Sequence, residues 1–250
     1  MNRNKPAAGL ALAALLAGTA DAANRMAFDG SLPVPSIFAH DEVPQADARP
    51  LAGQLKVFGA KVCGTPRIVA RAPGHFASAA PETLYLIVNC GAYSVAAGPH
   101  RESAGDLVLV RSGRVVAYKK GFGDALSILP DLNGDHLQEF VSGAWFGPHM
   151  GEDGLYGHLW QFRRGKLNMV MGLGPVYRET GVGLPDSEPA SVTVRTLWHD
   201  PARPNTLQAI DYRSPVCSAC KTPEAPYDPS RARQVVKVAV DLRYPPHQLP

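Results

Sequence analysis

The chain has 250 residues, of which 24 are Gly and 23 are Pro, nearly a fifth of the total against roughly 12% in ordinary proteins. This composition excludes a helical bundle and favours short strands joined by turns, while a hydrophobic content of 45% is enough for a packed core. The formal net charge of +3 is small and spread along the chain, so we expect no nucleic-acid partner.

The first 22 residues have the three parts of a secretory signal peptide. Arg3 and Lys5 precede an apolar stretch at residues 7–18, and residues 20–22 (ADA) form a small-x-small cleavage site. The apolar stretch is shorter than the roughly 20 residues that span a bilayer. We therefore predict cleavage near Ala22, a periplasmic or secreted mature chain, and no membrane span within it.

Four cysteines follow the predicted cleavage site, and an oxidising compartment favours disulfides. Four cysteines allow three pairings, and the sequence alone does not choose among them. We favour a Cys63–Cys90 bridge together with a local Cys217–Cys220 bridge, both structural. The alternative for the Cys217-Ser-Ala-Cys220 pair is a thiol-redox role.

The mature chain divides into two parts by composition. Residues 23–54 form a proline-rich lead-in, which we expect to be an extended strand or a loose linker. Residues 55–250 form a single all-β domain that contains repeats. Past the signal peptide we expect no amphipathic helix.

Short runs of β-forming residues recur along the domain, separated by turn residues. Two pairs of runs flank Ser112-Gly113 and Arg164-Gly165 and predict β-hairpins. The fold class is therefore all-β, with antiparallel hairpin units. The predicted strands cover residues 83–88, 106–111, 114–118, 158–163, 166–171, 191–196, 206–212 and 236–243.

The hairpins form an internal repeat. The turn glycines Gly113 and Gly165 lie 52 residues apart, and the Pro-Asp pairs at 130–131 and 185–186 lie 55 apart. A period near 50 residues is typical of stacked blades. We therefore expect a small or incomplete β-propeller, with a β-sandwich as the alternative.

One loop carries oxygen side chains at the spacing that wraps a hard cation. Asp131, Asn133, Asp135 and Glu139 occupy positions one, three, five and nine, and the backbone carbonyl of Leu137 is at position seven. This pattern predicts a structural calcium site. The alternative is a turn without an ion, because Asp and Asn side chains also cap their own backbone.

The segment LPDLNGDHLQEFVSGAW, residues 129–145, resembles the FG-GAP/VCBS repeat, which is also found in the α-subunit propeller of integrins. The resemblance implies blades whose calcium ligands are the five residues just named. His136 stands where the family has Gly. A second, degenerate copy, LPDSEPA, keeps only Asp186 of the ligand set.

No nucleophile, zinc-protease or nucleotide-binding motif is present in the sequence, so no reaction is identifiable. His149, Glu152 and His158 suggest a metal or polar site of a periplasmic enzyme as an alternative. Our first hypothesis is a calcium-stabilised binding or interaction module whose partner is an unidentified protein or glycan.

Overall fold

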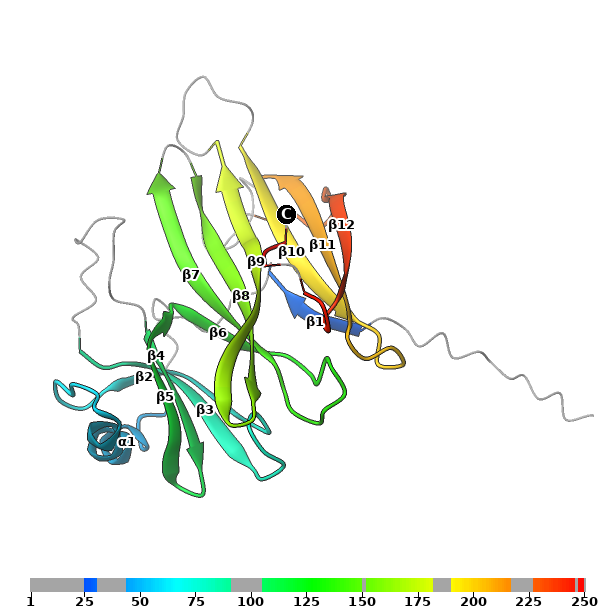
Figure 1. Ribbon diagram of the computed structural model, residues 1–250. Coiled ribbons are helices and arrows are strands. Elements are labelled where there is room, and N and C mark those ends of the chain that lie inside the picture. The colour runs from blue at the N-terminus through cyan, green and yellow to red at the C-terminus, as the bar shows by residue number, and fades with distance from the viewer. Residues whose placement is uncertain are drawn as a thin grey trace, which may run out of the picture.

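The protein is described by a computed structural model (Figure 1), in which twelve β-strands and one α-helix are defined within the described residues. The described residues are 25–30, 44–90, 105–149, 152–181, 190–216, 227–245 and 247–249.

The elements are taken here in chain order. The helical elements are α1 (Ala48–Leu55) and a single 3-10 turn, η1 (Lys56–Phe58). The strands are β1 (Arg25–Asp29), β2 (Arg67–Gly74), β3 (Glu82–Val88), β4 (Gly105–Arg111), β5 (Arg114–Gly123), β6 (Ala125–Ile128), β7 (Phe140–His149), β8 (Glu152–Arg163), β9 (Lys166–Thr180), β10 (Ser191–His199), β11 (Thr206–Pro215) and β12 (Arg233–Asp241).

The strands form two antiparallel sheets. β2 to β5 pair in chain order as a four-stranded sheet, and β6 to β12 pair in chain order as a second sheet, to which β1 adds beside β10. The all-β class and the antiparallel hairpins are thus confirmed. Because β9 bonds directly to β10, the second sheet is continuous, and the described strands do not show the closed ring of a propeller.

The β4–β5 and β8–β9 hairpins have the same two-residue turn. In the first, Ser112 and Gly113 have φ of +49° and +73°, and in the second, Arg164 and Gly165 have φ of +52° and +72°. Positive φ at both positions defines a type I′ turn, whose twist matches that of the flanking strands. Both hairpins are therefore in the positions that the sequence predicted.

The expectation that no helix follows the signal peptide was wrong, because α1 occupies residues that we had assigned to the lead-in. Ala48, Leu51 and Leu55 recur at helical spacing and are buried. Pro50 suggested a linker, but it lies in the first helical turn, where its missing N–H removes no intrahelical hydrogen bond. The predicted boundary at residue 54 therefore falls inside a helix.

The four-stranded sheet is covered on both faces. α1 packs on one face, in a cluster with Ile68, Tyr85 and Val108. The other face packs against β6 to β9, where Phe76 and Phe140 meet edge to face with ring centroids 6.1 Å apart. The sheet is thus the middle layer between a helix and a second sheet (Figure 1).

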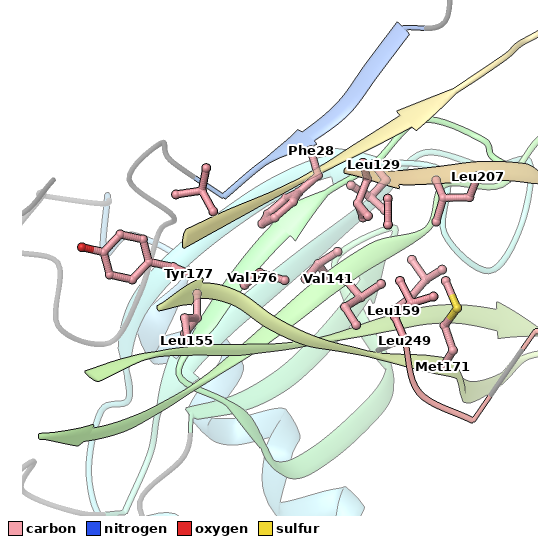
Figure 2. Packing of buried hydrophobic residues seen from close by; sticks show 14 of the residues in the cluster. Phe28, Leu129, Val141, Leu155, Leu159, Met171, Val176, Tyr177, Leu207 and Leu249 are labelled. Carbon is pink, nitrogen blue, oxygen red and sulfur yellow. The ribbon is translucent and has the colours of Figure 1, made fainter. Parts of the chain in front are cut away.

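A second core lies against the larger sheet (Figure 2). Phe28 of β1 packs there with side chains from β7 to β12, and Leu132 and Leu249 close it from loops. The N-terminal strand is therefore part of the core. Among the described residues, no helix is long and apolar enough to cross a membrane.

The predicted Cys63–Cys90 disulfide is present, with Cα atoms 5.1 Å apart. It joins the segment before β2 to the end of β3. Cys217 and Cys220 lie outside the described residues, so their pairing stays a prediction.

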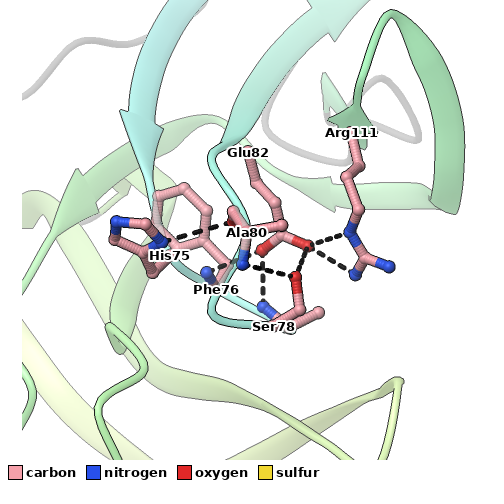
Figure 3. Close-up of polar contacts among 7 residues, drawn as sticks. His75, Phe76, Ser78, Ala80, Glu82 and Arg111 are labelled. Atoms are coloured by element: carbon pink, nitrogen blue, oxygen red, sulfur yellow. Dashed lines mark hydrogen bonds and ion pairs between the residues drawn. The ribbon is translucent and has the colours of Figure 1, made fainter.

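A buried carboxylate closes the β2–β3 turn (Figure 3). Glu82 accepts hydrogen bonds from the N–H groups of Phe76 and Ala77 at 2.8 and 2.7 Å and from the hydroxyl of Ser78 at 3.1 Å. Arg111 on β4 donates to the same carboxylate from Nε at 2.8 Å. Burial alone would raise the pKa of Glu82, but these bonds outweigh it and lower the pKa.

We predict that Glu82→Gln lowers the free energy of unfolding by about 2 kcal/mol at pH 7, because it removes a charged acceptor of several hydrogen bonds. A lowered folded-state pKa gives stability that is present above the unfolded value near 4.3 and is lost as the pH falls through the folded value. The deficit of the variant should therefore shrink in acid. Urea unfolding at pH 7 and pH 3 measures it.

The matched control is Glu152→Gln, which removes a half-exposed carboxylate paired with Arg178. We expect this control to lower the free energy of unfolding by less than about 1 kcal/mol. If Glu82→Gln lowers the free energy of unfolding by the same amount at pH 7 and at pH 3, the ionised Glu82 carboxylate does not stabilise the fold as we describe.

Candidate metal centre

The predicted cation loop, residues 131–139, joins β6 to β7. Gly134 has φ of +82° and His136 has φ of +67°, so the chain turns twice through the left-handed region. Gly adopts this region without cost, whereas a side chain such as His is strained there by roughly 1–2 kcal/mol. His136 thus occupies the conformation that suits the Gly implied by the family resemblance.

Side chains of the loop cap its own backbone. The carboxylate of Asp131 accepts hydrogen bonds from the N–H groups of Gly134 and His136, both at 2.7 Å. The side-chain oxygen of Asn133 accepts from the N–H of Asp135 at 2.9 Å. This is the capped turn that the sequence offered as an alternative, and its bonds draw the side chains inward.

Three carboxylates converge inside this turn. One oxygen from each of Asp131, Asp135 and Glu139 lies within 4.8 Å of the other two, which is close enough for a single metal ion to be held by all three. Asp135 is exposed, Asp131 is half-buried, and Glu139 is 2% exposed. Burial, together with the charges of Asp135 and Asp131, raises the pKa of Glu139 to about 8.

Two donors hold the buried carboxylate in place. Glu139 accepts from the N–H of Leu132 at 2.8 Å and from the side-chain amide of Asn133 at 2.6 Å. The same Asn133 amide nitrogen lies 3.1 Å from the side-chain oxygen of Gln161 on β8. Both oxygens of the Glu139 carboxylate therefore accept a hydrogen bond, but neither of these two donors carries a positive charge.

The predicted ligands are not all arranged alike. The three carboxylates come together, but Asn133 presents its nitrogen to Glu139 and its oxygen to the Asp135 N–H. Ligation by the Asn133 oxygen therefore stays a prediction. Leu137 lies in the same loop and donates its N–H to Asp135 at 2.9 Å, and ligation by its carbonyl stays a prediction.

A cavity of about 300 Å³ borders two of the three carboxylates, those of Asp135 and Glu139. Gln161 and Asn205 also line it, and Arg163 and Arg243 contribute guanidinium groups. Gln161 and Asn205 had no local signal in the sequence, because they reach the loop from β8 and from the β10–β11 turn. The cavity thus lies beside the Asp135 and Glu139 side of the cluster.

Backbone hydrogen bonds connect this loop to two other parts of the fold. The N–H of Gln138 donates to the carbonyl of His75 at 2.7 Å, in the β2–β3 turn. The N–H of Asn205, in the β10–β11 turn, donates to the carbonyl of Leu132 at 2.8 Å. The loop thus bonds to one turn of each sheet, and Asn205 in turn accepts from the N–H of Leu242, just after β12, at 2.7 Å.

The other predicted site is not assembled in this way. His149 and Glu152 pair across the β7–β8 turn, but His158 lies six residues from Glu152 on the same strand, about 20 Å away at strand spacing. The Glu152 carboxylate bonds to Arg178. Glu152 and His158 therefore do not share a site.

Comparisons with known proteins add no assignment: no family model, no curated protein and no solved structure matches this chain.

We predict that His136→Gly raises the free energy of unfolding by about 1 kcal/mol, because Gly relieves the positive φ at this position. Urea unfolding measures the gain. The control is His136→Ala, which removes the same imidazole but keeps a Cβ, so it should give no gain. Equal effects of the two substitutions would show that backbone strain at this position is not the cause.

Proposed function

We propose that this chain is a periplasmic or secreted β-sheet module that is stabilised by calcium and serves in binding rather than catalysis. The observation that carries the proposal is the convergence of Asp131, Asp135 and Glu139 within 4.8 Å around a buried carboxylate. The resemblance of this loop to the FG-GAP/VCBS repeat supports the same reading.

The chemistry of the donor set fits a hard cation. Three carboxylates this close repel one another, and burial makes the charge on Glu139 costly unless a cation neutralises it. Oxygen donors favour calcium or magnesium over softer metals. Calcium is favoured of the two, because it tolerates the irregular geometry of a single loop, whereas magnesium demands a near-ideal octahedron.

The position of the loop supports a structural role for the ion. A cation between the three carboxylates would fix the backbone that bonds to His75 in the β2–β3 turn and to Asn205 in the β10–β11 turn. Asp131, Asp135 and Glu139 would supply most of its charge neutralisation. The ion would thus hold the two sheets in register, with little of its coordination left for a substrate.

Aromatic side chains support a binding role. Trp145 and Tyr156 on β7 and β8 are 40% and 38% exposed, although side chains of this size are usually buried. Phe146 packs against Tyr156 with ring centroids 4.5 Å apart. Trp145 is paired with Leu155 and Tyr156 with Ala144, so the two rings lie on opposite faces of the sheet. Each would offer a protein or glycan partner its own flat apolar contact.

Two features support an oxidising compartment. Residues 1–22 have the pattern of a cleavable signal peptide, and Cys63 and Cys90 form a disulfide, a bond that is rare in reducing compartments. Calcium is also abundant enough outside the cytoplasm to fill sites of modest affinity.

We predict that calcium raises the melting temperature of the mature, oxidised chain by about 5–10 °C at one hundred times Kd. A ligand that binds only the folded state adds about 2.7 kcal/mol at that concentration, and each kcal/mol raises the melting temperature by about 2–4 °C at this chain length. Melts in excess calcium and in excess chelator measure the difference. The rise should be lost in Asp135→Asn.

The matched control is Asp186→Asn, which changes the acidic residue of the degenerate copy and should keep the full calcium-dependent rise. Identical melts of the unsubstituted chain in calcium and in chelator would overturn the proposal, and the loop would then be a capped turn.

A further inference from the structure

The cavity beside the carboxylate loop is formed by parts of the chain that lie far apart in sequence. Gln161 and Arg163 reach it from β8, Asn205 reaches it from the β10–β11 turn, and Asp135 belongs to the loop itself. Most of the side chains that line it are polar or charged, and all of them belong to the described residues. We refer to this cavity of about 300 Å³ as the amide cavity.

Two amide side chains in the cavity have unused hydrogen-bonding atoms. The side-chain oxygen of Gln161 accepts from Asn133 at 3.1 Å, whereas its nitrogen donates to no described residue. The side-chain nitrogen of Asn205 donates to the carbonyl of Asn133 at 3.2 Å, whereas its oxygen accepts from no described residue. One amide therefore offers a donor to a ligand, and the other offers an acceptor.

The charged side chains of the cavity are of both signs. Asp135 and Arg163 are exposed, and Arg163 forms no ion pair within the described part of the chain. Arg243 is paired with Asp241 at 2.6 Å, so this pair adds no net charge. The wall therefore combines donors with acceptors and does not select a simple anion or a simple cation.

The rest of the wall is apolar. Leu159 on β8, Val170 on β9 and Leu242 after β12 line the cavity, and Leu159 is fully buried. An apolar surface beside a few polar groups is typical of sites that bind small molecules. Such a surface suits the C–H groups of a ring whose substituents are polar.

We propose that the amide cavity binds one glycosyl unit of a glycan. A sugar hydroxyl both donates and accepts hydrogen bonds, so it complements the free nitrogen of Gln161 and the free oxygen of Asn205. The C–H face of the ring would lie on Leu159 and Val170, and the volume suits one sugar ring because it is at the lower end of small-molecule sites. This inference rests on the proposed binding role, in which a glycan is one of two possible partners.

Asn133 connects the amide cavity to the calcium ligands. Its side-chain nitrogen donates to Glu139 at 2.6 Å and to Gln161 at 3.1 Å, and its carbonyl accepts from Asn205. An ion that fixes the loop would also fix these two amides, without a bond between the ion and the sugar. Calcium should therefore strengthen sugar binding by ordering the wall of the cavity.

Amide NMR of the isotope-labelled, mature and oxidised chain tests the proposal in saturating calcium. The probes are glucose, galactose, mannose and N-acetylglucosamine, together with the free amino acid glycine, which carries both charges but no hydroxyl group. We expect at least one sugar to shift the side-chain amide signals of Gln161 and Asn205 in a saturable titration. Glycine should leave them unchanged, and chelator should weaken binding of the sugar.

Val170→Phe should abolish sugar binding, because the larger ring fills the cavity from β9. The matched control is Met169→Phe, which adds the same ring to an exposed neighbour outside the cavity and should change the affinity less than about twofold.

Asn205→Gly should weaken sugar binding about threefold or more, because it removes the free acceptor. Asn205 has φ of +69°, which Gly adopts without strain, so this substitution should preserve the turn. Unchanged melting temperatures show that the variants are folded.

Three results would overturn the proposal. They are the absence of amide shifts with all four sugars, an affinity that Val170→Phe leaves unchanged, and binding of glycine at the same amides that is tighter than that of any sugar. The calcium melts separate this outcome from failure of the proposed calcium site. A calcium-dependent rise without sugar binding overturns only the sugar site, whereas sugar binding with identical melts overturns only the calcium site.

Discussion

The structure depends on one turn, residues 131–139, whose backbone hydrogen bonds reach both sheets. Gln138 bonds to His75 in the β2–β3 turn, and Leu132 bonds to Asn205 in the β10–β11 turn. The same turn places three carboxylates together and buries Glu139. Unfavourable charge is therefore concentrated in a loop that bonds to one turn of each sheet. A cation bound here would neutralise the mutually repelling carboxylates and would stabilise the turn between the two sheets.

Buried charged side chains are found at two other places in the fold. Glu82 collects backbone donors and Arg111 to close one turn, and Arg195 pairs with Asp211 between β10 and β11, with both side chains almost fully buried. In each case a buried charge is compensated by an opposite charge from a neighbouring strand. The loop with Glu139 lacks such a cation among its described side-chain partners, which sets it apart from these structural networks.

The all-β class and the hairpins could be predicted because their signals are local, whereas the Cys63–Cys90 bridge was the favoured one of three possible pairings. Alternation of side chains marks strands, and Ser112-Gly113 marks a two-residue turn. α1 was missed because two helical turns give too short a periodic pattern, and because Pro50 resembles a linker residue although the first turn tolerates it. The continuous larger sheet was missed because the pairing of β9 with β10 is not encoded in either strand alone.

Part of the candidate site could also be predicted from the sequence. The spacing of Asp131, Asp135 and Glu139 along one loop was enough to expect that their carboxylates converge. The contributions of Gln161 and Asn205 were not predictable, because both come from strands or turns distant in sequence. The orientation of the Asn133 side-chain amide could not be predicted either, because it depends on hydrogen bonds to the Glu139 carboxylate and to the N–H of Asp135.

Amide hydrogen exchange is the most direct test of whether an ion stabilises this turn. It is measured at the two backbone hydrogen bonds that connect the turn to the β2–β3 and β10–β11 turns. The N–H groups of Gln138 and Asn205 should exchange at least about tenfold more slowly in saturating calcium than in chelator, because opening the turn would require release of the ion. The N–H of Gly172, bonded to His247 outside the turn, serves as the internal reference. Equal exchange of Gln138 and Asn205 in calcium and in chelator would contradict the account.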